Sequence, residues 1–291
     1  MPIFAKKTIR KPERLKRRCF LTFLTAVIVM PLTLLSYAFF MEPRRIRIIK
    51  YKIHSGNLPA EFNGTKIVFI TDTHHNLPYS ADLREQLLQL VEKNKPDLVL
   101  FGGDYASEND RSVKQFFDSC SKISAKLGMF GVLGNHDYWN PHKVSLAMEA
   151  AGIKNLTNAA TWIMKGSSRI KIAGVGDLWR GKQNLTPMKE GLKSDDFVIL
   201  LTHNPDYIDQ LSEKERKMID LVFAGHSHGG QVTVFGVYAP VATTLEKYRT
   251  GLITPWPNEK IRVIVSNGIG TVGIPVRFCA PPQLVIVELS R

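Results

Sequence analysis

Histidine, aspartate and asparagine residues stand together at several points in this chain, and their side chains are ones that bind metal ions. The densest group is the stretch Gly225–Gln231, which reads GHSHGGQ and places His226 and His228 among glycines. The apolar run before it, residues 218–224, predicts a buried strand that ends where the histidines begin. Glycines there allow the backbone to turn tightly around a bound group. Because short motifs also arise by chance, the interpretation depends on partners elsewhere in the chain.

Such partners follow four other predicted strands. They are Asp72 and His74 after residues 66–71, Asp104 after 96–101, Asn135, His136 and Asp137 after 129–133, and His203 after 197–202. In open α/β sheets, functional side chains gather at the carboxyl ends of the strands. We therefore expect these side chains to meet at one place. Taken singly, each has an ordinary alternative role as a helix cap, a turn residue or a core histidine.

The combined set suits a pair of metal ions. Two carboxylates, one carboxamide and four imidazoles are too many ligands for one ion, but they serve two ions if one carboxylate bridges. Imidazole favours Zn and Fe, and carboxylates favour Mn and Mg. We predict two divalent ions, with Mn favoured and Zn, Fe or Mg as alternatives. Such a centre binds a phosphate between its ions and supplies hydroxide near neutral pH.

The N-terminal part predicts a membrane anchor. Residues 19–40 contain no charge and are long enough to cross a bilayer as a helix. Residues 1–52 hold thirteen Lys and Arg against two acids, which accounts for +11 of the formal charge of +13. Basic flanks of this kind suit an anionic membrane surface better than a nucleic-acid groove. A cleaved export signal is the alternative, because Arg17-Arg18 resembles a twin-arginine motif and Ser36-Tyr37-Ala38 a cleavage site.

The predicted domains are a basic tail (1–18), the anchor or signal (19–40), a linker (41–60) and one α/β domain (61–291). Within that domain the hydrophobic periodicity predicts helices over 80–93, 112–127 and 144–151, and a hairpin from 161–165 and 169–173. Later strands are expected at 221–224, 232–235, 262–266 and 284–289. Cys19, Cys120 and Cys279 are far apart and odd in number, which excludes a disulfide framework.

The motifs D-x-H, G-D, G-N-H-D, L-x-H-x-P and G-H-x-H, in that order, resemble those of the calcineurin-like metallophosphoesterases over about residues 65–290. The GHSHGGQ ending, with SNGIGT at 266–271 and APP at 280–282, is similar to the membrane-associated YkuE/YaeI-like branch. That branch includes a UDP-2,3-diacylglucosamine pyrophosphatase of lipid A synthesis. The resemblance implies a four-layered α/β/β/α sandwich of two sheets.

The resemblance also implies roles for individual residues. One metal would be bound by Asp72, His74, Asp104 and His228, and the second by Asp104, Asn135, His203 and His226, with Asp104 bridging. The attacking species would be a metal-bound hydroxide. His136 and Asp137 would be catalytic, with Asn135 and His136 contacting the phosphate. His75 is a further candidate substrate contact, although a structural role is favoured. Arg180, Lys182 and Arg249 are candidate phosphate contacts, with a solvated surface position as the alternative.

These observations lead to a membrane-anchored, two-metal hydrolase of a phosphoester or pyrophosphate bond, with a lipid-linked substrate such as UDP-2,3-diacylglucosamine. That substrate requires a catalytic domain on the cytoplasmic side of the cell membrane. An exported phosphodiesterase or phosphatase of the envelope is the alternative, with its domain outside. A non-catalytic membrane binding protein is the alternative from another class. Nucleic-acid binding is not expected, because residues 53–291 are nearly neutral.

Overall fold

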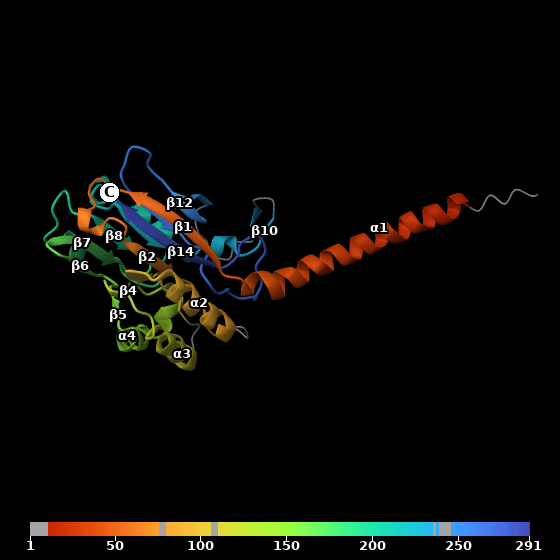
Figure 1. The fold of residues 1–291 in the computed structure, drawn as a ribbon, viewed down its shortest axis with the longest axis horizontal. Coiled ribbons are helices and arrows are strands. Elements are labelled where there is room, and N and C mark those ends of the chain that lie inside the picture. The colour runs from red at the N-terminus through yellow and green to blue at the C-terminus, as the bar shows by residue number, and fades with distance from the viewer. Residues whose placement is uncertain (1–10, 76–79, 106–109, 235–236, 239–245) are drawn as a thin grey trace, which may run out of the picture.

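The computed structural model describes residues 11–75, 80–105, 110–234, 237–238 and 246–291, and in them two six-stranded sheets lie face to face (Figure 1). The first sheet is built from β1 (Arg47–His54), β14 (Gln283–Ser290), β2 (Lys66–Ile70), β3 (Leu98–Phe101), β4 (Met129–Gly131) and β5 (Ile153–Asn155), in that order. Only the β14–β2 pair is antiparallel in this sheet.

The second sheet has the order β12 (Gly251–Ile253), β13 (Arg262–Val265), β9 (Leu221–Ala224), β8 (Val198–Leu201), β7 (Ser168–Gly174) and β6 (Ala159–Lys165). Its central strands are parallel, and both outer pairs are antiparallel. A small separate ribbon pairs β10 (Thr233–Val234) with β11 (Val237–Tyr238). The strand expected at 232–235 corresponds to β10, and Phe235 lies outside the described residues.

Helices cover the outer faces of both sheets. Figure 1 shows α2 (Ser80–Asn94), α3 (Asp110–Cys120) and α4 (Pro141–Ala150) together against the first sheet. The short helices α5 (Thr186–Lys189) and α6 (Glu213–Arg216) belong to the other side of the molecule. The long helix α1 (Lys11–Ser36) extends away from the domain.

Side-chain alternation in the strands produces three cores. In β2, Val68 and Ile70 pack against the helices, whereas Ile67 and Phe69 pack between the sheets. In β9, Phe223 lies between the sheets and Val222 packs on the far side, in the core that includes Met188 of α5. Strands that are buried on both faces read as continuous apolar runs. The predicted α/β/β/α sandwich is therefore confirmed.

The structure contains strands that the sequence did not predict, among them β5 and β12, and it changes two of the predicted segments. Residues 47–54, expected in a linker, form β1, which pairs with β14 along eight residues. Its charged residues at the sheet edge obscured a period-two pattern in which Ile49, Tyr51 and Ile53 pack against the inter-sheet core. The helix expected over 112–127 ends at Cys120, where the Ser121 hydroxyl donates to the carbonyl of Asp118 at 2.7 Å.

The apolar N-terminal helix joins the domain through a defined contact. Within the described residues, one helical segment, Leu15–Arg44, is long and apolar enough to cross a membrane by length and composition. At its end, the buried carboxylate of Glu42 accepts hydrogen bonds from the backbone N–H groups of Cys279 (3.1 Å) and Ala280 (2.8 Å). The N–H of Arg277 donates to the carbonyl of Ala38 at 3.0 Å. The end of the helix is thus tied to the loop 277–280.

We expect Glu42→Ala to lower the free energy of unfolding by about 1–3 kcal/mol, because two N–H groups in loop 277–280 lose a charged acceptor. Thermal or denaturant unfolding of the detergent-solubilised chain measures this. The matched control is Glu288→Ala, which removes an exposed ion pair with Lys52 at 3.8 Å and should change stability by less than about 1 kcal/mol. Equal effects of the two variants would contradict the structural role of Glu42.

Candidate metal centre

The five candidate loops meet at one edge of the two sheets. Asp72 follows β2, Asp104 follows β3 and Asn135 follows β4, three parallel neighbours of the first sheet. His203 follows β8 and His226 follows β9, which are parallel neighbours in the second sheet. Because the carboxyl ends of parallel strands point the same way, residues spread over the chain come together.

The first group of candidate ligands is Asp72, His74 and His228, whose ligand atoms all lie within 4.8 Å of one another and are buried. His228 Nε2 lies 3.5 Å from Asp72 Oδ1. The other carboxylate oxygen of Asp72 accepts the Thr71 hydroxyl at 2.6 Å, and the N–H of His226 contacts both oxygens at 3.0 Å. These contacts fix the orientation of the carboxylate.

The second group, Asp104, His203 and His226, meets the same distance limit. His203 Nε2 lies 3.2 Å from Asp104 Oδ2 and 3.1 Å from the carboxamide oxygen of Asn135. Asp104 Oδ2 is also 3.6 Å from His74 Nε2, in the first group. One carboxylate oxygen therefore contacts both groups, which is the position that the predicted bridging ligand requires.

Five of the seven predicted ligands have a left-handed backbone. Their φ angles are 50° at Asp72, 40° at His74, 54° at Asp104, 69° at His226 and 50° at His228. Non-glycine residues adopt such angles rarely, at a cost of about 1–3 kcal/mol each, and they concentrate at functional sites. The surrounding fold therefore holds these side chains in a strained, converging arrangement, which no sequence pattern indicated.

The electrostatics favour neutral imidazoles beside a negative centre. Burial lowers the pKa of His74 to about 4 and that of His226 to about 3, and it places that of His228 well below the usual value. Burial has the same tendency at His203, but the carboxylates of Asp104 and Asp72 outweigh it and raise that pKa. The negative charge of these two carboxylates, which raises the pKa of His203, also attracts a metal cation.

The structure fits divalent ions at this place. His226 and His228 each have a buried Nε2 without a hydrogen-bond partner among the described residues, and buried polar atoms of this kind call for a ligand. His203 Nδ1 lies 2.8 Å from the carbonyl oxygen of Gly102. A carbonyl only accepts, so Nδ1 donates a proton to it, and Nε2, which faces Asp104, is the nitrogen that a bound metal ion would contact in place of a proton.

His136 and Asp137 occupy different environments. His136 is half-buried, and its ring centroid lies 5.1 Å from that of His74. Asp137 is fully buried and faces the backbone, where it accepts hydrogen bonds from the N–H groups of Asp104 and Gly134 (both 2.8 Å) and of Tyr105 (3.1 Å). Burial and the Asp104 carboxylate raise the pKa of Asp137, and the three N–H donors oppose that rise. These contacts make Asp137 a positioning residue for the loops.

The structure does not bring His75 into the centre. Its Nε2 lies 2.7 Å from a guanidinium nitrogen of Arg84 on α2, and its ring packs 6.1 Å from that of Phe116. His75 follows His74 directly, so the backbone that aims His74 inward turns His75 toward the helices. These contacts agree with the structural role that the sequence favoured for His75 over a substrate contact.

Arg277 is a buried residue beside the centre that sequence reasoning missed. Its guanidinium donates to the carbonyls of Ala280 (2.6 Å), Asn267 (2.7 Å) and Gly270 (3.0 Å), and it lies 3.4 Å from His228 Nδ1. Fully buried arginines are uncommon. No motif marks the position, because its partners are backbone carbonyls that only the fold assembles.

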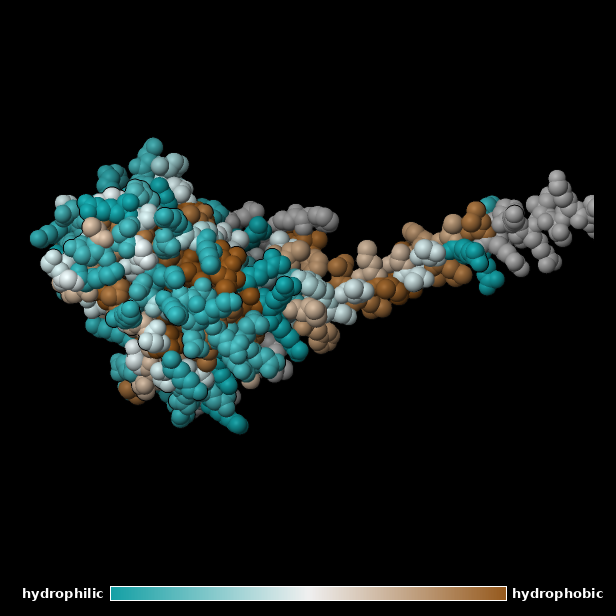
Figure 2. Space-filling model, in the orientation of Figure 1, coloured by the Kyte–Doolittle hydropathy of each residue, from teal (hydrophilic) through white to brown (hydrophobic). Residues whose placement is uncertain are grey.

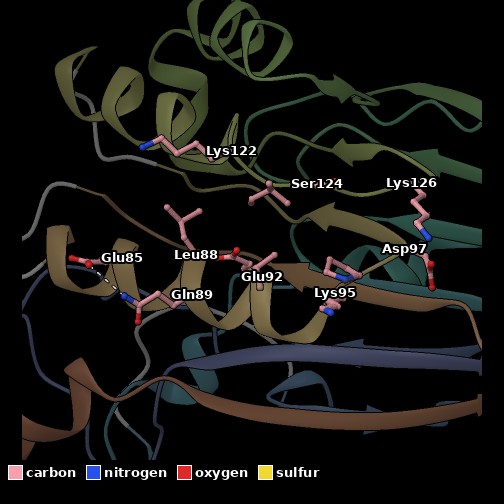
Figure 3. Close-up of a pocket in the computed structure, with 12 residues that line it drawn as sticks. Glu85, Leu88, Gln89, Glu92, Lys95, Asp97, Lys122, Ser124 and Lys126 are labelled. Carbon is pink, nitrogen blue, oxygen red and sulfur yellow. Dashed lines mark hydrogen bonds between the residues drawn. The ribbon is translucent and has the colours of Figure 1, made fainter.

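A separate cavity of about 650 Å³ lies between α2 and the segment after α3. Figure 3 shows its lining, with Glu85, Glu92 and Asp97 interspersed with Lys95, Lys122 and Lys126. No predicted metal ligand lines this cavity, so the chemistry belongs to the Asp and His groups.

Residues 65–230 match the calcineurin-like phosphoesterase family, and the chain belongs to that family. It is 33% identical over 259 residues to an uncharacterized metallophosphoesterase of Aquifex aeolicus, an alignment that covers 86% of this chain and 94% of the relative. The phosphodiesterase YaeI of Escherichia coli is 28% identical, covering 94% and 99% respectively. The UDP-2,3-diacylglucosamine pyrophosphatase LpxG of Chlamydia trachomatis is 26% identical, covering 91% and 95%. The chain is thus a metallophosphoesterase with two candidate metal-binding groups.

We expect the purified chain, equilibrated with Mn(II), to hold two ions, and His228→Ala to hold one, because His228 belongs to the first group only. His136→Ala is the matched control and should keep both ions, because His136 belongs to neither group of candidate ligands. Inductively coupled plasma mass spectrometry measures the stoichiometry, with circular dichroism as a check on folding. Retention of two ions by His228→Ala would contradict the assignment.

Proposed function

We propose that this chain is a membrane-anchored two-metal hydrolase that cleaves a phosphoester or pyrophosphate bond in a lipid-linked substrate such as UDP-2,3-diacylglucosamine. In this proposal residues 1–18 form a basic tail, residues 19–40 cross the membrane, and the domain from β1 (Arg47–His54) to residue 291 is catalytic. The observation that carries the reaction class is the position of Asp104 Oδ2 between the two groups, 3.6 Å from His74 Nε2 and 3.2 Å from His203 Nε2.

Two divalent ions held by Asp72, His74, Asp104, Asn135, His203, His226 and His228 would supply a nucleophile from water near neutral pH and stabilise charge on the phosphoryl oxygens. The chain's own contribution is orientation. The N–H of His136 donates to Asp104 Oδ1 at 2.8 Å, so the bridging carboxylate and the His136 backbone are positioned together. The half-buried His136 ring can then contact the phosphate or donate a proton to the leaving oxygen.

The lipid-linked substrate is supported by the connection between the anchor and the centre. Glu42 and Ala38 bind the loop 277–280, and Arg277 of that loop lies against His228. The domain is therefore held with its candidate metal centre close to the point where the apolar helix ends. An anchored enzyme also meets membrane-bound substrates at a raised local concentration.

Exposed apolar side chains near this junction support the same proposal. Phe40 and Met41 follow α1, Val234 and Val237 belong to the β10–β11 ribbon, and Ile274 precedes the loop 277–280. Figure 1 shows the ribbon beside the place where α1 leaves the domain, and Figure 2 shows hydrophobic residues along that helix. Exposed apolar groups that adjoin a membrane-spanning helix suit contact with lipid.

The test uses detergent-solubilised full-length protein and its His228→Ala variant, supplied with Mn(II). We expect cleavage of UDP-2,3-diacylglucosamine that EDTA abolishes and that falls at least about 100-fold in the variant, because a metal ligand is lost. Methyl p-nitrophenyl phosphate serves as a generic ester. Cleavage of the generic ester alone would retain the hydrolase and exclude this lipid, whereas no cleavage of either would contradict the proposed reaction.

The second candidate is an envelope phosphodiesterase, which the likeness to YaeI and the paired Arg17 and Arg18 favour. Protease treatment of intact spheroplasts separates the two. The lipid substrate requires a protected domain, because its nucleotide donor is cytoplasmic, and that protection is the result we expect. Digestion of the domain in intact spheroplasts, with a cytoplasmic marker preserved, would favour the envelope enzyme.

A further inference from the structure

The loop over residues 176–183 carries two exposed side chains next to the metal centre. The Trp179 side chain is 46% exposed, although its ring centroid lies only 4.3 Å from that of the predicted ligand His226, with the planes at 85°. Arg180 is exposed and lines a cavity of about 220 Å³ together with Asn135, His136, Tyr138 and Trp139. Packing of the domain therefore does not account for either side chain.

The backbone beneath these side chains is held firmly. The buried carboxylate of Asp177 accepts hydrogen bonds from the N–H groups of Trp179 (2.9 Å) and Arg180 (2.8 Å). Asn158 accepts from the N–H of Gly176 at 2.9 Å and donates to the carbonyl of Lys182 at 2.8 Å. An ordered loop that presents an aromatic ring and a cation to solvent resembles a preorganised binding surface.

Tyr138 supports the loop from the opposite side. A Cβ atom at Gly181 would lie 2.2 Å from the Tyr138 hydroxyl oxygen, so only glycine allows the loop to pack this closely. Tyr138 follows Asn135, His136 and Asp137 on the same short helical segment, Asn135–Trp139. The loop 176–183 therefore packs against the same helical segment that carries the proposed phosphate contacts Asn135 and His136.

The charge and shape of the surface indicate an anionic ligand with a planar group. The Arg180 guanidinium forms no side-chain hydrogen bond or ion pair within the described part of the chain, and guanidinium groups bind phosphate with two parallel donors. An exposed indole offers a flat apolar face on which nucleobases stack. Both groups lie beside the place where the two metal-binding groups would hold the reacting phosphate.

We propose that Trp179 and Arg180 form a subsite for the nucleoside diphosphate half of the substrate. Arg180 binds the phosphate next to the one held at the metal centre, and Trp179 stacks against the base. This inference rests on the proposed hydrolase function. It adds a chemical basis for preferring a nucleotide-linked pyrophosphate over a simple phosphodiester.

The test measures inhibition of methyl p-nitrophenyl phosphate hydrolysis by UDP, UMP and ribose 5-phosphate, with Mn(II) in excess over the nucleotides. We expect UDP to inhibit more strongly than UMP, and UMP more strongly than ribose 5-phosphate. In the unmodified protein, we expect the inhibition constant of UMP to be lower than that of ribose 5-phosphate by about fivefold or more. Trp179→Ala should make the two constants equal, whereas Trp179→Phe should preserve the difference. Arg180→Ala should likewise remove the difference between the inhibition constants of UDP and UMP, which we expect to be about tenfold.

Lys182→Ala is the matched control, because the structure places this candidate phosphate contact at the solvated surface of the same loop, outside the lining of the cavity. It should leave all three inhibition constants unchanged. Cleavage of UDP-2,3-diacylglucosamine or of the methyl ester verifies the proposed function independently, and the absence of both activities would refute that function. Normal hydrolysis with equal inhibition by UMP and ribose 5-phosphate, or with unchanged constants in Trp179→Ala and Arg180→Ala, would overturn the subsite alone.

Discussion

The arrangement of the site depends on how closely the loops after β3 and β4 approach each other around Asp104. A Cβ atom at Gly103 would lie 2.3 Å from the backbone nitrogen of Gly134, and one at Gly134 would lie 2.2 Å from Asp104 Oδ1. Only glycine permits this contact. The Asp137 carboxylate then joins the two loops through the N–H groups of Asp104 and Gly134. As a result, one carboxylate oxygen reaches histidines from both sheets.

A shared loop also connects the candidate metal centre to the apolar N-terminal helix. Loop 277–280 accommodates the buried guanidinium of Arg277 next to His228, and its N–H groups bind the Glu42 carboxylate at the end of the apolar helix. The candidate metal centre and the end of the apolar helix are therefore parts of one packed unit. A shift of the helix end at Glu42 would therefore move loop 277–280, whose Arg277 contacts the predicted ligand His228.

In these proposals, the reaction class and the choice of substrate depend on different parts of the molecule. The strained residues Asp72, His74 and Asp104 lie on short turns directly after central strands, where a rigid sheet fixes their geometry. Trp179 and Arg180 lie on a longer connection after β7, which can vary without disturbing the sheets. Members of one fold family can thus retain a common phosphoryl chemistry and differ in substrate.

The sequence alone determined the ligand types and the strands that precede them, because apolar runs followed by Asp, Asn or His are local patterns. It also predicted the sandwich through those motifs, and the apolar helix through its length. The register of β1 against β14 was not predictable, since its pairing partner lies more than 220 residues away in the chain. The sequence also could not predict that His74 points into the site, that His75 points toward the helices or that Arg277 is buried. Those features depend on left-handed backbone angles and on carbonyl groups that come together only when the two sheets pack.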